Sequence, residues 1–156
     1  MEKVVAFAGH RDSWRCIGVK EKLLQTIEGL IQQDYTIFYD GNKGAFDEKC
    51  FNAIVELKEK YPYIKIVRVL SHYQHNKENF FLSKSVDETI FPPIEQYYPK
   101  QRITKRNEWI VDNCDILVCH IEMPYKSGAY KMVKYAQKKN KKIIEIKKKE
   151  PIGLFL

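Results

Sequence analysis

The stretch TKRNEWIVDNCDILVCHIEMPYKSGAYKMVKYAQKKNKKIIEI, residues 104–146, decides the fold that the sequence predicts. A polar helix start carrying Arg106 and Asn107 leads into an apolar strand at residues 116–119, and the loop after that strand meets a new helix at Gly128. In an open α/β sheet, ligands bind at the carboxyl ends of strands, where loops meet helix N-termini. We therefore expect this loop to form one wall of a phosphate-binding pocket, with Arg106 facing it.

Strands and helices alternate along the whole 156-residue chain. Short apolar and β-branched runs predict strands at residues 4–8, 35–39, 64–70, 116–119 and 142–146. Helical spacing of apolar side chains predicts helices at residues 20–33, 46–60, 104–113 and 128–139. This order is typical of an α/β fold, a Rossmann-like, doubly wound and mostly parallel sheet of about five strands with helices on both faces. A single domain is expected to span residues 1–156.

Two stretches fit this alternation less well. Residues 71–102 lack clear periodicity over a length that is often a functional lid or excursion. Thr104, just after them, is expected to cap the next helix. The last six residues, PIGLFL, are apolar, and we expect them to dock on the body of the domain or on a second subunit.

The composition favours anionic partners and a cytoplasmic globular protein. Lys and Arg number 27 against 20 Asp and Glu, a net charge of +7 that suits nucleotides and nucleic acid alike. The four cysteines form neither a CxxC motif nor a disulfide-like rhythm, so we expect reduced thiols. No apolar run approaches the ~20 residues that span a bilayer, and the start MEKVVAFAG is too short and too charged for a secretory signal. We therefore expect no contact with a membrane.

Three glycine-containing turns follow predicted strands, at residues 9–11, 41–44 and 127–128. Glycine lets backbone N–H groups approach an anion, and a helix N-terminus adds a favourable dipole. None of the turns matches an established phosphate-binding fingerprint, and each alone is most often only a turn. Because parallel strands end at one edge of a sheet, we expect the turns to meet there. The candidate ligand-binding residues, with Tyr125 expected to stack on a base, are Gly9, His10, Arg11, Gly41, Gly44, Asp47, Arg106, Asn107, Tyr125, Ser127 and Gly128.

Charged side chains give this site its expected chemistry. Arg106 and Arg11 can each fork onto a phosphate with two parallel hydrogen bonds. An equally good hypothesis makes Arg106 a surface group or the partner of Asp112 or Asp115. Asp47 lies in the first turn of a predicted helix. Its carboxylate either only interacts favourably with the helix dipole, or it also accepts a hydrogen bond from a sugar hydroxyl.

Metal and covalent chemistry are not expected. His72 and His75 lie three residues apart, but no Cys or carboxylate falls at a matching ligand spacing, even when His10 or His120 is added. No serine lies in a G-x-S-x-G motif, and no cysteine has an obvious base in its sequence neighbourhood. We therefore expect neither a metal nor another cofactor.

Three segments carry a resemblance to a known family: AFAGHR at residues 6–11, FYDGNKGAFDEKCFNAIVELKEKYPYIK at 38–65, and KRNEWIVDNCDILVCHI through KSGAYKMVKYAQKKNKKII at 105–144. Through them the chain resembles the SLOG superfamily, which includes the LOG cytokinin-activating phosphoribohydrolases, the DNA-processing protein DprA and the YpsA-like proteins. It is most similar to small bacterial and phage members of that group. The resemblance implies a Rossmann-like sheet, a nucleotide-related ligand at the strand ends, and often a homodimer.

The resemblance also bears on catalysis. LOG enzymes cleave the bond between base and ribose phosphate, using an arginine and the glutamate of a Pro-Gly-Gly-x-Gly-Thr-x-x-Glu motif. Arg106 matches the arginine. When the motif is laid from Pro124, Gly128 keeps one of its glycines, but the glutamate falls on or near Lys131. A protonated lysine has the opposite charge and accepts no hydrogen bond, so it cannot replace that acid.

Three functional hypotheses follow. The first is a binding or sensor protein for a nucleotide or a nucleotide derivative. The second is an enzyme resembling a nucleoside-monophosphate phosphoribohydrolase, in which Arg106 acts with Asp47 or Glu122 in place of the missing glutamate. The third is a nucleic-acid binder like DprA, driven by the lysine-rich last third of the chain. The sequence leaves open whether the chain is an enzyme.

Overall fold

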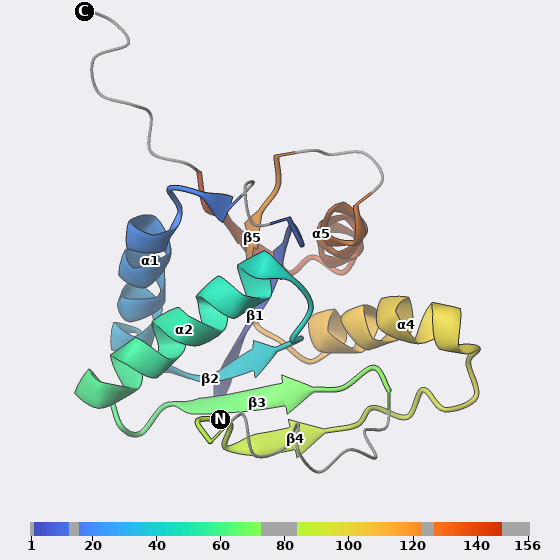
Figure 1. Cartoon of the computed structure of the whole chain (residues 1–156), viewed down its shortest axis with the longest axis horizontal. Helices are drawn as coiled ribbons and strands as arrows, with labels where there is room; N and C mark the ends of the chain where they lie inside the picture. The colour runs from blue at the N-terminus through green and yellow to red at the C-terminus, as the bar shows by residue number, and fades with distance from the viewer. Residues whose placement is uncertain (1, 13–15, 73–83, 123–126, 148–156) are drawn as a thin grey trace, which may run out of the picture.

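The structure is a computed structural model that describes residues 2–12, 16–72, 84–122 and 127–147. Six strands form one parallel sheet in the order β4-β3-β2-β1-β5-β6 (Figure 1). The strands are β1 (Lys3–Gly9), β2 (Tyr35–Asp40), β3 (Lys65–Val69), β4 (Glu88–Ile90), β5 (Ile116–His120) and β6 (Lys142–Glu145). The helices are α1 (Lys20–Gln32), α2 (Ala45–Lys60), α4 (Pro99–Asp112) and α5 (Gly128–Lys138). The predicted α/β, Rossmann-like, doubly wound sheet is confirmed.

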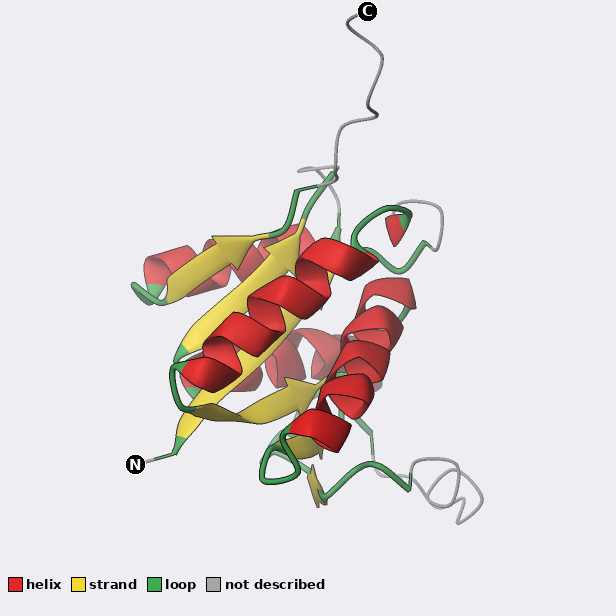
Figure 2. Ribbon diagram, turned by 90° about the vertical axis from the view of Figure 1, so that its left-hand side faces the viewer, coloured by secondary structure: helices red, strands yellow, loops and turns green. Residues whose placement is uncertain are grey.

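Two hydrophobic layers enclose the sheet. Helices α1 and α2 pack on one face of the sheet, and α4 and α5 pack on the other (Figures 1 and 2). Leu23 of α1 and Phe46 of α2 belong to the first layer, whereas Ile110 of α4 and Met132 of α5 belong to the second. Alternate residues of β1 serve the two layers, because successive side chains of a strand point to opposite faces. This explains why the predicted strands are continuous apolar runs. None of the described helices is long and apolar enough to cross a membrane.

The four cysteines are buried thiols that form no disulfide with one another. Cys16 and Cys50 lie in the layer that contains α1 and α2, whereas Cys114 and Cys119 lie in the layer that contains α4 and α5. Burial raises the pKa of the Cys50 thiol well above its ordinary value, and it raises the pKa values of Cys114 and Cys119 to about 11. All four side chains therefore serve as small apolar groups of the core.

The segment at residues 71–102 holds a sixth strand that was not predicted. β4 pairs in parallel with β3, with Val67 opposite Glu88 and Val69 opposite Ile90. It is only three residues long, too short to show the alternation by which a strand is recognised in a sequence. Residues 73–83 of the expected excursion, and the terminal PIGLFL, lie outside the described residues.

The helix predicted from Thr104 begins earlier. α4 starts at Pro99, with Tyr98 as the N-cap residue, so Thr104 lies inside the helix and the capping prediction is wrong. Proline suits the first helical position because its missing N–H has no partner there anyway and its fixed φ matches the helix. The Tyr98-Pro99 pair marked the true start.

The N-terminus of α2 is bonded to the turn that follows β1. The first two amides of α2 donate to the carbonyls of Arg11 and His10, both at 3.1 Å. Gly44 has a φ of +92°, and a side chain there would meet Arg11 Cα at 2.5 Å. A methyl group at Gly9 would overlap the ring of Phe46. These glycines therefore allow the start of α2 to pack directly against the end of β1 and the turn that follows it.

We predict that Gly9→Ala destabilises the fold by about 1–3 kcal/mol, because the added methyl must displace the buried Phe46 ring. Gly29→Ala is the matched control: it lies within α1 and has open space around it, so it should stabilise the protein by about 0.5–1 kcal/mol. Urea unfolding of both variants measures the two effects. Equal stabilities for the two variants would contradict the packing described for Gly9.

Candidate functional site

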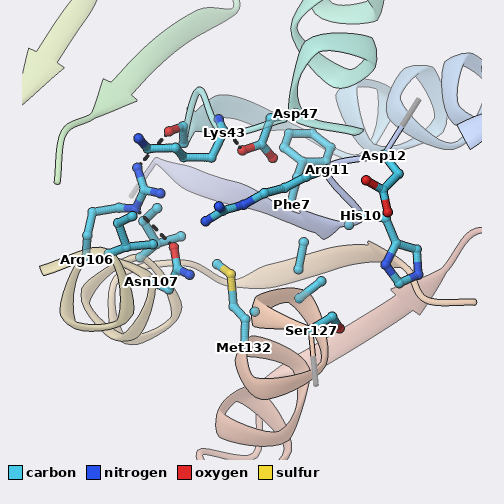
Figure 3. A pocket seen from close by; sticks show the side chains of 17 residues that line it. Phe7, His10, Arg11, Asp12, Lys43, Asp47, Arg106, Asn107, Ser127 and Met132 are labelled. Carbon is cyan, nitrogen blue, oxygen red and sulfur yellow. Dashed lines mark hydrogen bonds between the residues drawn. The ribbon is translucent and has the colours of Figure 1, made fainter. Parts of the chain in front are cut away.

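A cavity of about 420 Å³ lies at the carboxyl edge of the sheet, between the turn after β1, the loop after β2, α4 and α5 (Figure 3). It brings together all but two of the predicted site residues, namely Gly9, His10, Arg11, Gly41, Asp47, Arg106, Asn107, Ser127 and Gly128. Gly44 lines an adjoining hollow instead. Tyr125 lies outside the described residues. The three turns therefore meet as expected, while the ligand-binding roles of these residues stay predictions.

Arg106 is buried, with 2% of its surface exposed, and its guanidinium is held by the backbone. Nη1 donates to the carbonyls of Gly41 at 2.7 Å and Val69 at 2.9 Å, and Nε donates to Asn107 Oδ1 at 3.0 Å. The burial lowers the pKa of Arg106, an effect that the nearby Asp47 carboxylate opposes. Arg106 is thus a fixed cation that ties α4 to the ends of β2 and β3.

One expectation for Arg106 is wrong, and a second stays a prediction. It is neither a surface group nor the partner of Asp112 or Asp115, because Asp112 binds Tyr135 and Asp115 accepts the Val4 amide. It lines the same cavity as the residues that open α5, but its bonds run to the β2 and β3 side. Residues 123–126 of the loop that it was expected to face lie outside the described residues.

Asp47 contributes a carboxyl group that titrates near neutrality. Its Oδ2 accepts the Lys43 amide at 2.9 Å, so it reaches back to the loop before α2 rather than along the helix. The absence of a side chain at Gly41 lets the Asp47 carboxyl and the Arg106 guanidinium both lie close to the backbone there. A Cβ at Gly41 would lie 3.1 Å from Asp47 Oδ2 and 3.4 Å from Arg106 Cζ. Desolvation raises the pKa of Asp47 to about 7, with a smaller contribution from Asp40, although the Lys43 amide and the arginines oppose the shift.

His10 has a structural role. It is buried, and its Nε2 accepts the backbone amide of Glu122 at 2.6 Å, which requires a neutral ring with the proton on Nδ1. Its ring meets that of His120 edge to face, with centroids 6.1 Å apart. His10 therefore joins the end of β1 to the segment after β5, and the same nitrogen cannot also donate to a ligand.

The N-terminus of α5 opens on the cavity. Ser127 is the N-cap, and its hydroxyl accepts the Tyr130 amide at 3.0 Å. Gly128 and Ala129 come next and line the cavity. Their amides have no partner within the helix, because the first N–H groups of a helix precede any carbonyl four residues earlier in it. They supply the positive end of the helix dipole to the cavity.

Arg11 is an exposed cation that extends across the cavity toward Arg106 and Asn107 (Figure 3). Within the described parts of the chain, no hydrogen bond or ion pair holds its guanidinium. Lys43 adds a third cation to the cavity lining, and the lining also contains the carboxyl groups of Asp12 and Asp47. With Asp47 partly protonated near pH 7, the cavity carries an excess of positive charge.

Sequence reasoning missed several cavity residues, among them Asp12, Lys43 and Met132. Asp12 directly follows the first predicted turn, and Lys43 lies inside the second. The rule that loops at the ends of strands form the site could have predicted both residues. Met132 is one helical turn after Gly128, on the same face of α5, so the helical period was the available signal.

The histidines considered for metal binding do not form a site in the part of the chain that the structure describes. His72 Nδ1 lies 2.9 Å from the Ser71 hydroxyl. His75 falls outside the described residues. Among the residues described, no group of three or more His, Cys, Asp or Glu side chains is placed to hold a metal ion.

Asp47→Asn should alter the pH dependence of stability. Between about pH 4 and pH 7 the native protein binds a proton at Asp47 that the unfolded chain has lost, so the free energy of unfolding falls as the pH rises. Because the substitution removes this titrating carboxyl, the variant should be more stable than the wild type at pH 8 by on the order of 1–3 kcal/mol. At pH 4 the two proteins should have nearly the same stability. This range lies below the full linkage value because Asp47 is only half-buried, so solvent screens part of its charge.

Urea unfolding from pH 4 to pH 8 measures this difference. Glu48→Gln is the matched control, since it removes an exposed carboxyl from the next position of α2. Parallel stability profiles for wild type and Asp47→Asn would show that Asp47 titrates normally.

No family model and no curated protein matches the chain. Solved structures that share its fold include the following two. One is the molybdenum cofactor carrier protein of Chlamydomonas reinhardtii, with a TM-score of 0.56 and 12% identity over 93% of this chain and 76% of that chain. The other is a structure of the Moco carrier protein of the same alga, with a TM-score of 0.52, 13% identity and the same coverage. At this identity the likeness establishes the Rossmann-like fold.

Proposed function

We propose that the protein binds a phosphorylated, nucleotide-related small molecule in the cavity at the carboxyl edge of the sheet. The observation that carries this proposal is the convergence of Arg11, Arg106 and the N-terminus of α5 on one cavity. Two like-charged guanidinium groups repel each other, so an anion between them is stabilised by both. Asp47 balances this charge only in part, because its pKa is near 7.

The donors suit a phosphate group in kind and arrangement. Arg106 is held by bonds through Nη1 and Nε, and none of the hydrogen bonds of the described residues uses Nη2. Nη2 is therefore the part of this rigid group that is available to a ligand. Arg11 adds a long side chain whose guanidinium can donate two parallel hydrogen bonds to a phosphate. The backbone amides of Gly128 and Ala129 add the positive end of a helix dipole.

Two likenesses support a small-molecule ligand. The structural neighbours are molybdenum cofactor carrier proteins, and a carrier function in this fold agrees with a cavity that binds a small molecule. The resemblance to the SLOG superfamily favours a nucleotide-related compound. We extend the proposal to membership of that superfamily, a cytoplasmic location and a homodimer.

A second candidate function is hydrolysis of a nucleoside monophosphate. The observation that favours it is Asp47, a carboxyl with a pKa of about 7 beside Arg106, because such a group can both give and accept a proton at neutral pH. Incubation with AMP, followed by detection of free adenine, tests this candidate. Turnover that Asp47→Asn abolishes would establish an enzyme and displace a purely binding role.

Arg11→Ala should weaken the binding of orthophosphate and AMP by about 10–100-fold, the value of one or two hydrogen bonds to a charged group. The melting temperature should not change, because the side chain is exposed. Isothermal titration calorimetry measures the affinities. Lys138→Ala, which removes an exposed cation from the far end of α5, is the control and should bind as the wild type does. Failure of the wild type to bind either compound would overturn the proposed function.

A further inference from the structure

A second hollow, of about 300 Å³, continues the cavity along the groove between α4 and α5. The two share five lining residues, which form the junction between them: Arg11, Ile103, Asn107, Gly128 and Met132. Arg11 therefore stands where one hollow passes into the other. A ligand held at the first cavity has a direct path into the second.

The walls of the second hollow are two regular helix faces. Lys100, Ile103, Thr104, Asn107 and Glu108 follow the spacing of one face of α4. Across the groove, one face of α5 contributes Gly128, Lys131, Met132 and Tyr135. Such a face is set by the helical period, so the hollow does not depend on loop conformation. The buried Met132 and the half-buried Ile103 make the middle of the path apolar.

The far part of the hollow is cationic. Lys100 from α4 and Lys131 from α5 face it from opposite helices. The acid of this wall, Glu108, is paired with Lys105 at 3.5 Å, so its charge is partly balanced outside the hollow. Tyr135 donates its hydroxyl proton to Asp112 at 2.9 Å, so it has no further proton to donate to a ligand. The charge available to a ligand here is therefore positive.

We propose that the groove between α4 and α5 is a second anion subsite, and that the ligand is a nucleoside whose ribose carries two separate phosphate groups. This inference rests on the proposed function, since it takes the first anion to occupy the cavity at Arg11 and Arg106. Seven residues separate Asn107 from Lys100, a rise of about 10 Å along α4, and the flexible lysine side chains shorten the span that a ligand must cover. A nucleoside bisphosphate has the required chemistry.

The test compares adenosine 3′,5′-bisphosphate with AMP by isothermal titration calorimetry. The wild type should bind the bisphosphate about 5–10-fold more tightly than AMP, because two partly exposed ion pairs are added. The double variant Lys100→Ala/Lys131→Ala should lose this preference and keep the wild-type affinity for AMP. Lys131→Glu should reverse it. The control is Lys134→Ala, an exposed lysine of α5 that lies over the Tyr130 ring and outside both hollows, and it should keep the preference.

The outcomes separate this inference from the proposed function. Binding of AMP with no gain for the bisphosphate overturns the second subsite alone. A gain that survives in the double variant also overturns it, since the extra phosphate would then be bound elsewhere. Failure to bind AMP, orthophosphate and the bisphosphate overturns both proposals.

Discussion

The buried guanidinium of Arg106 is the constraint on which the site depends. Its Nη1 donates to the carbonyls of Gly41 and Val69, so one side chain links α4 to the ends of two neighbouring strands. Removing a charge from water costs several kcal/mol unless hydrogen bonds and opposite charge compensate for it. Here strand-end carbonyls and the carboxyl groups of Asp47 and Asp40 provide that compensation. The position of α4, and hence one wall of the cavity, follows from this requirement.

The two helices that begin beside the cavity use their N-termini differently. The first amides of α2 are occupied by the carbonyls of Arg11 and His10, so this terminus joins two strand ends. The first amides of α5 face the cavity instead, with Ser127 capping the turn. His10 adds a third link by accepting the amide of Glu122. One terminus therefore stabilises the scaffold, while the other is left for an anion.

Much of the fold could be predicted because its signals are local. The periods of apolar residues indicated the strands and helices, and parallel topology placed Gly9, Gly41 and Gly128 at one edge. β4 could not be found, because three residues carry no period. The bonds of Arg106 could not be found either, since they join residues 65 and 37 positions apart through carbonyls that every residue possesses. The near-neutral pKa of Asp47 likewise comes from burial that only the folded chain creates.

The buried cysteines give the domain an internal reporter for each of its two faces. Cys16 and Cys50 lie in the hydrophobic layer that contains α1 and α2, whereas Cys114 and Cys119 lie in the layer that contains α4 and α5. A thiol reacts as the thiolate, and burial with a raised pKa suppresses that form at Cys50, Cys114 and Cys119. Alkylating reagents therefore modify these thiols mainly when a helical layer separates from the sheet. Mass-resolved labelling rates thus measure how often each layer opens, without adding any probe to the chain.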